Sequence, residues 1–312
     1  MNEQLPAFTI FAHVYYPEIW EEMLKDLERI IKQPFRLVIT RPVGSTPAAI
    51  PNTSYLHSAE EFEVDNRGRD ILPFLKALRA DEKQASDIGL KLHTKYSPHR
   101  VDGADWRRFL CASLLRVDGE GRLLGHSLLE REHRVGLIAP EAHLLALDGR
   151  TSINGAGISE VLIALYGKSS AGHPARRFAA GSMFWFRRAG LERLIEKETE
   201  YMFAQEHGQL DGTAAHALER LFVTVVERQG LLAAGMENAI PILSAPHEAM
   251  TSSDLLKLVE KTLVHQNQFA VALPAFWRKH PYLLRLLHVI YARLPKKVVR
   301  FIHSSRRRVQ GR

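Results

Sequence analysis

Short apolar runs alternate with amphipathic stretches along the first third of the chain. The runs are rich in β-forming residues and predict four strands, at residues 8–16, 35–40, 62–64 and 88–93. Between them, residues 18–32 and 70–79 carry apolar side chains at helical spacing. Strands that alternate with helices predict a mostly parallel sheet with helices on both faces, so the expected fold class is α/β.

The pattern continues through the rest of the chain. It predicts helices at residues 105–117, 158–166 and 212–228, and strands at residues 135–138 and 178–186. From about Thr251 the pattern is again helical, and three prolines break it into short pieces, at Pro274, Pro281 and Pro295. We therefore expect one domain over residues 1–250 and a basic helical tail over residues 251–312.

Composition places the chain among globular proteins. Its 312 residues, 46% hydrophobic and 25% charged, are enough to bury a substantial core. The single cysteine, Cys111, has no partner for a disulfide and is expected to be a small buried hydrophobe in a reducing compartment. The sequence shows neither a secretory leader pattern nor 18 consecutive strongly apolar residues, which predicts a cytoplasmic protein without a membrane span.

The net charge of +7 is unevenly distributed along the chain. Residues 261–312 contain 12 Lys and Arg and no Asp or Glu, whereas the remaining residues carry 30 Lys and Arg against 35 Asp and Glu. The basic character therefore belongs to the tail. The rest of the chain has no overall electrostatic signature of nucleic-acid binding.

The densest group of titratable residues surrounds Asp211. Asp-Gly-Thr at 211–213 predicts a turn followed by a helix start, and Glu206, His216, Glu219 and Arg220 lie close by in the sequence. This spacing gathers titratable side chains near one helix entrance, which is typical of an acid/base site. An N-cap surrounded by ordinary surface charges is the alternative.

Two further polar motifs follow the ends of predicted strands. Residues 66–70 read Asn-Arg-Gly-Arg-Asp, and residues 91–100 read Lys-Leu-His-Thr-Lys-Tyr-Ser-Pro-His-Arg. The carboxyl ends of parallel strands are where open α/β sheets bind ligands. For the first motif the alternative is a turn with Gly68 at positive φ and Asp70 capping the next helix. For the second motif the alternative is that Lys91 and Lys95 extend from a strand edge into solvent and that His93 is a core histidine.

An aromatic motif, Gly-Ser-Met-Phe-Trp-Phe, occupies residues 181–186. Aromatic rings stack against the C–H faces of sugars. The alternative is a buried strand in which Phe184 and Phe186 face one layer and Trp185 the other.

These four segments, in this order and at this spacing, resemble the rhamnan synthesis protein F family. Its members are bacterial glycosyltransferases of rhamnose-containing cell-surface polysaccharides. The resemblance runs from about Phe8 to about Gly230 and includes Trp106 to Arg108 and Gly136 to Pro140. It implies a GT-A-like domain that moves a sugar, L-rhamnose from dTDP-L-rhamnose, to a hydroxyl of a lipid-linked glycan.

The resemblance also implies roles for the motif residues. Donor binding falls to Asn66, Arg67, Asp70, His93 and Lys95, and acceptor binding to Gly181, Ser182, Trp185 and Arg220. By analogy with GT-A enzymes, Asp211 is the base of an inverting displacement, with His216 orienting it and Glu206 as the alternative base.

Metal dependence stays open at the level of sequence. Many GT-A enzymes hold a divalent ion with an Asp-x-Asp motif, and this chain contains none. Fixed cations such as His93 and Lys95 can neutralise a leaving diphosphate in place of a metal. Asp211 and His216 remain candidate ligands for Mn²⁺ or Mg²⁺.

Basic and aromatic residues are interleaved in the tail over residues 276–308. We expect this segment to bind an anionic membrane surface and to hold the protein at the inner face of the bacterial plasma membrane. The alternative for this segment is that its apolar residues pack on the main domain. Two alternatives remain for the function of the protein: nucleic-acid binding, and a non-catalytic scaffold of a polysaccharide assembly complex.

Overall fold

The computed structural model describes residues 7–81, 86–94, 96, 102–147, 154–168, 174–205, 212–246, 250–261, 282–283 and 286. The predicted catalytic residues Glu206 and Asp211, the predicted donor residue Lys95 and nearly all of the segment 276–308 lie outside these residues.

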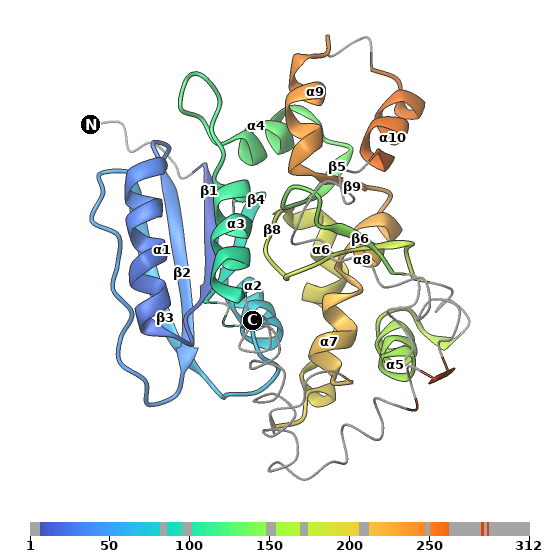
Figure 1. Cartoon of the computed structure of the whole chain (residues 1–312). Coiled ribbons are helices and arrows are strands. Elements are labelled where there is room, and N and C mark those ends of the chain that lie inside the picture. The colour runs from blue at the N-terminus through green and yellow to red at the C-terminus, as the bar shows by residue number, and fades with distance from the viewer. Residues whose placement is uncertain are drawn as a thin grey trace, which may run out of the picture.

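A seven-stranded sheet forms the centre of the molecule (Figure 1). Its order is β3 (Leu56–Val64), β2 (Phe35–Pro42), β1 (Phe8–His13), β4 (Ile88–His93), β8 (Phe184–Arg187), β5 (Val135–Ala139) and β9 (Leu232–Gly235). Only β8 runs antiparallel to its neighbours within this sheet. The predicted α/β class with a mostly parallel, GT-A-like sheet is confirmed.

Helices cover both faces of the sheet, and each face has its own hydrophobic core. One core is shared by α1 (Pro17–Ile30), α3 (Gly103–Leu114), α4 (Leu124–Arg131), α9 (Ala239–Ser244) and α10 (Ser252–Glu260). The other is shared by α2 (Ile71–Ala80), α5 (Gly155–Tyr166), α6 (Arg188–Glu196), α7 (Ala214–Glu219) and α8 (Phe222–Arg228).

The remaining elements are short. β6 (Leu144–Ala146) and β7 (Arg177–Ala179) form a two-stranded sheet, and η2 (Glu200–Met202) and η3 (Met236–Asn238) are single turns of 3₁₀ helix. The strand predicted over 178–186 is therefore two strands, β7 and β8, separated by a turn over residues 180–183. That turn lies next to the carboxyl end of β4.

Alternation along β8 divides its aromatic residues between the two cores. Trp185 packs in the first core, while Phe184 and Phe186 pack in the second. The Trp185 ring is fully buried, and its indole nitrogen donates to the carbonyl of Leu114 at 2.8 Å. An acceptor sugar cannot reach this ring, so its assignment to acceptor binding is corrected: it is a core residue, as the buried-strand alternative predicted.

The first helix of the predicted tail packs on the main domain. Leu255 and Val259 of α10 are buried in the first core, and the side chain of Asn238 donates to the carbonyl of Leu258. Cys111 is also buried, as predicted, and burial raises the pKa of its thiol to about 12. Among the described helices, none combines the length and the apolar character that a membrane crossing requires.

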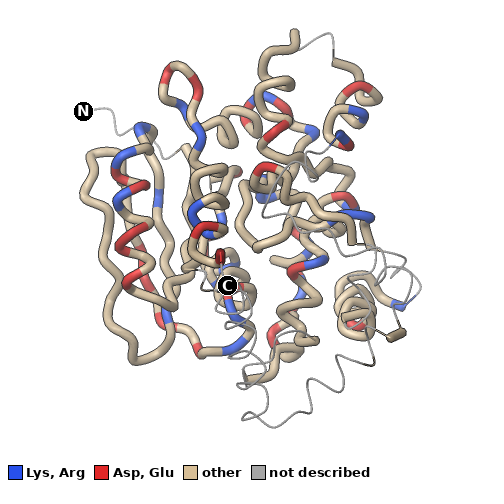
Figure 2. Tube along the Cα trace, in the orientation of Figure 1, with Lys and Arg blue, Asp and Glu red and all other residues tan. Residues whose placement is uncertain are grey.

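Charges of both signs are interspersed over the described elements, as Figure 2 shows along α1. This agrees with the near balance of charge outside the tail.

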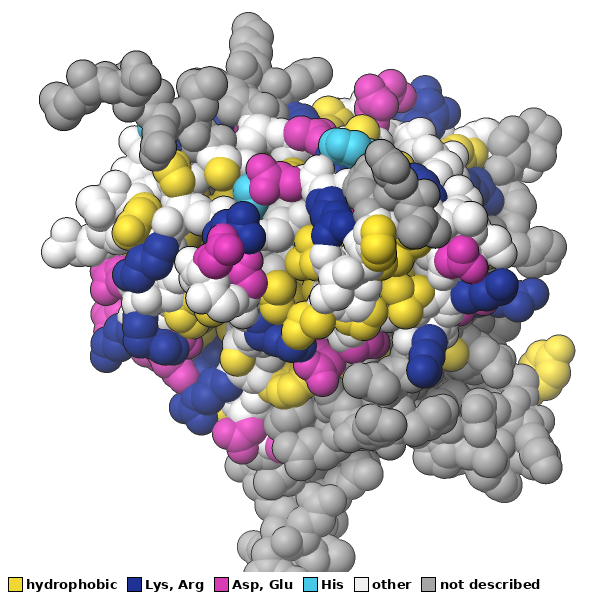
Figure 3. Space-filling view, turned by 90° about the horizontal axis from the view of Figure 1, so that it is seen from above, with side chains coloured by type: hydrophobic (Ala, Val, Ile, Leu, Met, Phe, Trp, Pro, Cys, Tyr) yellow, Lys and Arg dark blue, Asp and Glu magenta, His cyan; other side chains and the backbone are white. Residues whose placement is uncertain are grey.

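A hollow with an apolar centre lies at the opposite edge of the sheet from the polar motifs. Figure 3 shows the molecule from this edge. The hollow is lined by Val117, Leu124, Ile240 and Leu243 together with Asp118, Arg122, Glu130 and Arg131. The segment around α4 bonds to Gln33 and Ala7, which precede β2 and β1, so the hollow lies at the amino ends of these strands. Open α/β sheets bind their ligands at the other edge.

Candidate functional site

The polar motifs meet at the carboxyl edge of the parallel strands. His13 ends β1 and His93 ends β4, and the two residues are paired in register across the strands. The segment 66–70 follows β3 and leads into α2, and the turn 180–183 precedes β8. Residues that are far apart in sequence therefore share one edge, as the strand pattern predicted.

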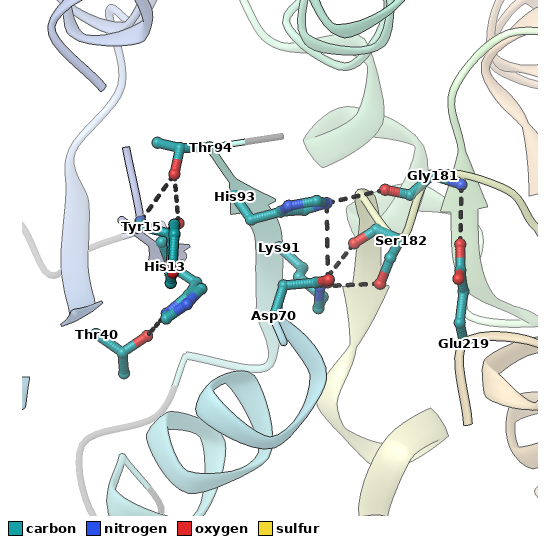
Figure 4. A network of polar contacts seen from close by, with 10 residues as sticks. All are labelled: His13, Tyr15, Thr40, Asp70, Lys91, His93, Thr94, Gly181, Ser182 and Glu219. Carbon is teal, nitrogen blue, oxygen red and sulfur yellow. Dashed lines mark hydrogen bonds and ion pairs between the residues drawn. The ribbon is translucent and has the colours of Figure 1, made fainter. Parts of the chain in front are cut away.

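A buried lysine joins two of these segments (Figure 4). Lys91 Nζ donates to Asp70 Oδ2 at 2.6 Å, to the Ser182 carbonyl at 2.7 Å and to Ser182 Oγ at 3.0 Å. The Lys91 side chain is 1% exposed and that of Asp70 is 16% exposed. Asp70 occupies the N-cap position of α2 but makes no side-chain cap, because its carboxylate faces Lys91 instead.

His93 bonds to the same turn. Its Nε2 lies 3.0 Å from the carbonyl of Gly181 and 3.7 Å from Asp70 Oδ2. Because a carbonyl only accepts hydrogen bonds, Nε2 carries a proton. From the other side, the Gly181 amide donates to Glu219 Oε1 of α7 at 3.3 Å. The turn is thus held by β4 and by α7.

Backbone in the left-handed region occurs in both polar segments. Gly181 and Ser182 have φ values of 90° and 56°, and Gly68 and Arg69 have φ values of 72° and 56°. Positive φ at a non-glycine residue is uncommon and tends to occur where function requires a particular geometry. The sequence alternative for Gly68, a positive φ in a turn, agrees with the structure.

His13 is neutral near physiological pH. Burial lowers its pKa from 6.5 to about 4, Lys91 adds to the lowering, and Asp70 opposes it. Its Nδ1 lies 3.0 Å from the hydroxyl of Thr40, its register partner in the neighbouring strand β2. His13 therefore supplies a neutral polar group to the edge.

Three tyrosines cluster beside the polar residues. The rings of Tyr15 and Tyr16 are 4.8 Å apart, and those of Tyr16 and Tyr96 are 5.3 Å apart. Tyr15 is 42% exposed and Tyr96 is 60% exposed. The Thr94 hydroxyl accepts hydrogen bonds from the amides of Tyr15 and Tyr16, which fixes the backbone after β1. The cluster presents aromatic surface to solvent at the carboxyl edge of the parallel strands.

Trp106 of α3 borders the turn 180–183. Its ring is half-buried, and its Cζ2 would lie 3.6 Å from a Cβ atom added at Gly181. Unlike Trp185, it has surface that a ligand can contact. Arg107, the next residue, is buried and forms an ion pair with Glu22.

The remaining predicted donor residues lie near the same edge with protein partners of their own. The Asn66 amide nitrogen is 3.5 Å from the hydroxyl of Tyr15, and Arg67 pairs with Glu200 in η2. Both contacts place segment 66–70 beside the tyrosine cluster and η2.

The predicted helix start after Asp211 is confirmed, with one correction. The N-cap of α7 is Thr213. Its hydroxyl accepts from the His216 amide, and the His216 imidazole accepts from the Thr213 amide, which makes a reciprocal capping box. His216 is buried at this cap, and Arg220 donates to the His216 carbonyl at 2.8 Å. The N-cap of α7 is therefore Thr213 and not Asp211, which lies outside the described residues.

Among the described residues, no group of three His, Cys, Asp or Glu side chains could hold a metal ion. Asp70 is a carboxylate at the described edge, and its neighbours are Lys91 and His93.

Sequence reasoning missed the tyrosine cluster, His13 and the bridging position of Lys91. One signal was present: residues 13–16 read His-Val-Tyr-Tyr directly after an apolar strand, at the edge where ligands bind.

Comparisons with known proteins agree with the resemblance seen in the motifs. Residues 3–231 match the model of a family described as RgpF, rhamnan synthesis protein F. Over 252 residues the chain is 34% identical to a protein of Xanthomonas campestris pv. campestris strain B100 whose name is "Uncharacterized protein WxcX", and equally to WxcX of strain ATCC 33913. This alignment covers 77% of the chain and 34% of each relative, so the chain spans about a third of their length. No solved structure matches the chain.

Proposed function

The chain belongs to the rhamnan synthesis protein F family, and we propose that it is a glycosyltransferase of cell-surface polysaccharide synthesis. In the proposed reaction, L-rhamnose moves from dTDP-L-rhamnose to a hydroxyl of a lipid-linked glycan. The acceptor oxygen bonds to the anomeric carbon as the bond from that carbon to the diphosphate breaks. A carboxylate takes the hydroxyl proton, and the configuration at the anomeric carbon inverts.

One observation carries the proposal: the donor-side segment 66–70 and the turn 180–183 converge on Lys91 at the carboxyl edge of the sheet. A transferase must bring two substrates together at a fixed distance, and here two separate segments meet at a single buried group.

For the donor, the exposed tyrosines supply surface on which a nucleobase can stack. Stacking of a base on an aromatic side chain contributes about 1–3 kcal/mol. Asn66 lies next to Tyr15, and Asp70 belongs to the same segment 66–70. They offer an amide and a carboxylate to the hydroxyls of a sugar. His93 and Lys95 are proposed to face the diphosphate, whose negative charge grows as it leaves.

For the acceptor, the proposal uses the turn at Gly181 and Ser182 together with Trp106 in place of Trp185. The half-buried indole of Trp106 borders the turn and can stack on a sugar face. Arg220, at the end of α7, completes the acceptor side in this proposal.

The base is proposed to be Asp211, oriented by His216, with Glu206 as the alternative. Asp70 is less suited to this role, because a carboxylate that accepts from an ammonium at 2.6 Å is a poor proton acceptor. The reaction is proposed to occur at the cytoplasmic face of the plasma membrane, where residues 276–308 would contact anionic lipids.

The test is turnover of nucleotide sugars by the full chain. Purified protein is mixed with dTDP-L-rhamnose or with other nucleotide sugars, with and without EDTA, and release of nucleoside diphosphate is measured with and without a lipid-linked glycan. We expect release that depends on the acceptor and is highest for dTDP-L-rhamnose. Absence of both binding and release for every nucleotide sugar would reject the proposal and favour the non-catalytic scaffold.

Tyr96 offers a matched pair of variants for the donor subsite. Tyr96→Phe keeps the ring and should bind dTDP as the unaltered protein does, whereas Tyr96→Ala should weaken binding by about 1–3 kcal/mol. Equal binding by both variants would remove the tyrosine cluster from the donor subsite.

A further inference from the structure

Lys91 occupies a position where a central strand ordinarily carries an apolar residue. Its neighbours in β4, Leu90 and Leu92, point into the first core, so Lys91 points into the second. There its ammonium lies 5.3 Å from the ring centroid of Phe74 and 5.9 Å from that of Phe184. Burying an ammonium is unfavourable unless hydrogen bonds and an opposite charge compensate it.

The compensation comes from two segments that are distant in sequence. Asp70 lies 21 residues before Lys91 and Ser182 lies 91 residues after it. An ammonium has three N–H donors, and among the described residues Lys91 Nζ donates to three acceptor atoms: one oxygen of Asp70 and two of Ser182. The lysine therefore ties segment 66–70 directly to the turn 180–183.

The turn is a segment that needs such a tie. Ser182 is 2% exposed and has a φ of 56°, a conformation that L-residues disfavour. In this conformation both its carbonyl and its hydroxyl reach Lys91. Gly181 beside it is held by His93 through its carbonyl and by Glu219 through its amide.

We propose that Lys91 is a positioning residue of the transfer reaction. It holds the Gly181–Ser182 turn against Asp70, so that the acceptor and donor subsites keep one relative geometry. The effect of Lys91 on transfer rests on the proposed function, whereas the tie, the set of bonds from Lys91 to Asp70 and Ser182, is a feature of the fold. Without the tie, the donor still binds, but the acceptor hydroxyl is misplaced and water competes for the anomeric carbon.

The primary test is Lys91→Met, which keeps most of the side-chain volume and removes the charge. The matched control is Lys257→Met on α10, where the lysine is 76% exposed. We expect Lys91→Met to bind dTDP within about threefold of the unaltered protein. Transfer should fall about 100-fold, as expected for a misplaced reactant, while donor hydrolysis changes far less. A purely structural role would lower transfer and hydrolysis in parallel, and that result would overturn the proposal.

A second readout does not depend on catalysis. Hydrogen exchange at the Gly181 and Ser182 amides should become at least about tenfold faster in Lys91→Met, with exchange in β2 unchanged. If the unaltered protein turns over no nucleotide sugar, the proposed function has failed, and the exchange result alone decides whether the tie exists. Unchanged exchange at the turn would refute the tie.

Ser182 supplies the check if Lys91→Met does not fold. Ser182→Gly removes the hydroxyl and accepts the positive φ, whereas Ser182→Ala removes the hydroxyl and keeps the strained backbone. Both variants should raise the ratio of hydrolysis to transfer. Where Lys91→Met does fold, the double variant with Ser182→Gly should lose less transfer than the product of the two single losses, because the two residues act through one contact. Independent effects would contradict the proposal.

Discussion

The indole nitrogen of Trp106 donates to Nε2 of His143 across 2.8 Å. An indole N–H only donates, so His143 Nε2 accepts and the ring proton lies on Nδ1, which donates to the Glu141 carbonyl at 2.7 Å. The His143 carbonyl in turn accepts from the amide of Ala180. This chain of bonds places the Trp106 ring beside the turn 180–183.

Trp106→Ala should therefore raise the KM for the glycan acceptor. The expected loss is about 0.5–1.5 kcal/mol, a factor of about 2 to 10. The control is Trp185→Phe, which alters a fully buried ring and should lower the free energy of unfolding by about 1–3 kcal/mol without changing the acceptor KM. Steady-state kinetics and urea unfolding distinguish the two. An acceptor KM that responds to Trp185 and not to Trp106 would reverse the assignment.

His13 should make the protein less stable in mild acid. Its pKa is about 4 in the folded protein and 6.5 in the unfolded chain, so between these values the unfolded state binds a proton that the folded state does not. The free energy of unfolding therefore falls as the pH drops from 6.5 to 4, by up to about 3 kcal/mol. His13→Gln should flatten this part of the curve in urea titrations at several pH values. His57→Gln, which alters an exposed residue on β3, is the control. A slope unchanged in His13→Gln would contradict the prediction.

Asp211→Asn should abolish transfer and leave dTDP binding within a few-fold. A general base contributes about 10² to 10⁴ in rate, and Thr213, which caps α7, is untouched by the change. Single-turnover transfer should be compared with that of Glu206→Gln. Near-normal transfer by Asp211→Asn, with loss in Glu206→Gln, would move the base to Glu206.

Lys95→Ala should weaken dTDP binding by about 1.5–3 kcal/mol, the range for hydrogen bonds to charged groups. His93→Ala should do the same, although it also removes the bond to the Gly181 carbonyl, which makes Lys95 the cleaner test. Calorimetry with and without Mn²⁺ provides the measurement. If neither change matters and a chelator abolishes binding, a metal neutralises the diphosphate, and Asp211 with His216 would be its expected ligands.

Truncation at about Pro274 should abolish binding to anionic vesicles and leave the main domain folded, because α10 ends at Glu260. Each Lys or Arg near an anionic surface contributes about 1 kcal/mol, and the attraction weakens with salt. Sedimentation with anionic and with neutral vesicles is the measurement. Equal binding to both kinds of vesicle, or binding that survives truncation, would reject membrane attachment by the tail. Preference for nucleic acid over anionic vesicles at physiological salt would support nucleic-acid binding instead.

The sequence alone determined the class of the fold and the edge of the sheet where the motifs lie. Apolar runs such as residues 8–13 and 88–93 are short, β-rich and separated by a helical pattern, and this is local information that side-chain periodicity carries. Because the segment 66–70 and His93 follow strand ends, their common edge also followed from the chain order.

Only the tertiary structure decided which side chains face the site and which face the core. The insertion of antiparallel β8 between β4 and β5 buries Trp185 and brings Ser182 to Lys91, 91 residues away in sequence. Periodicity predicts to which face of a strand a side chain points. It does not predict which residues of a distant segment pack against that face. For Lys91, the described acceptors come from Asp70 and Ser182, in two other parts of the chain. The sequence shows a basic residue near a strand end, and only the fold shows that it joins segment 66–70 to the turn 180–183.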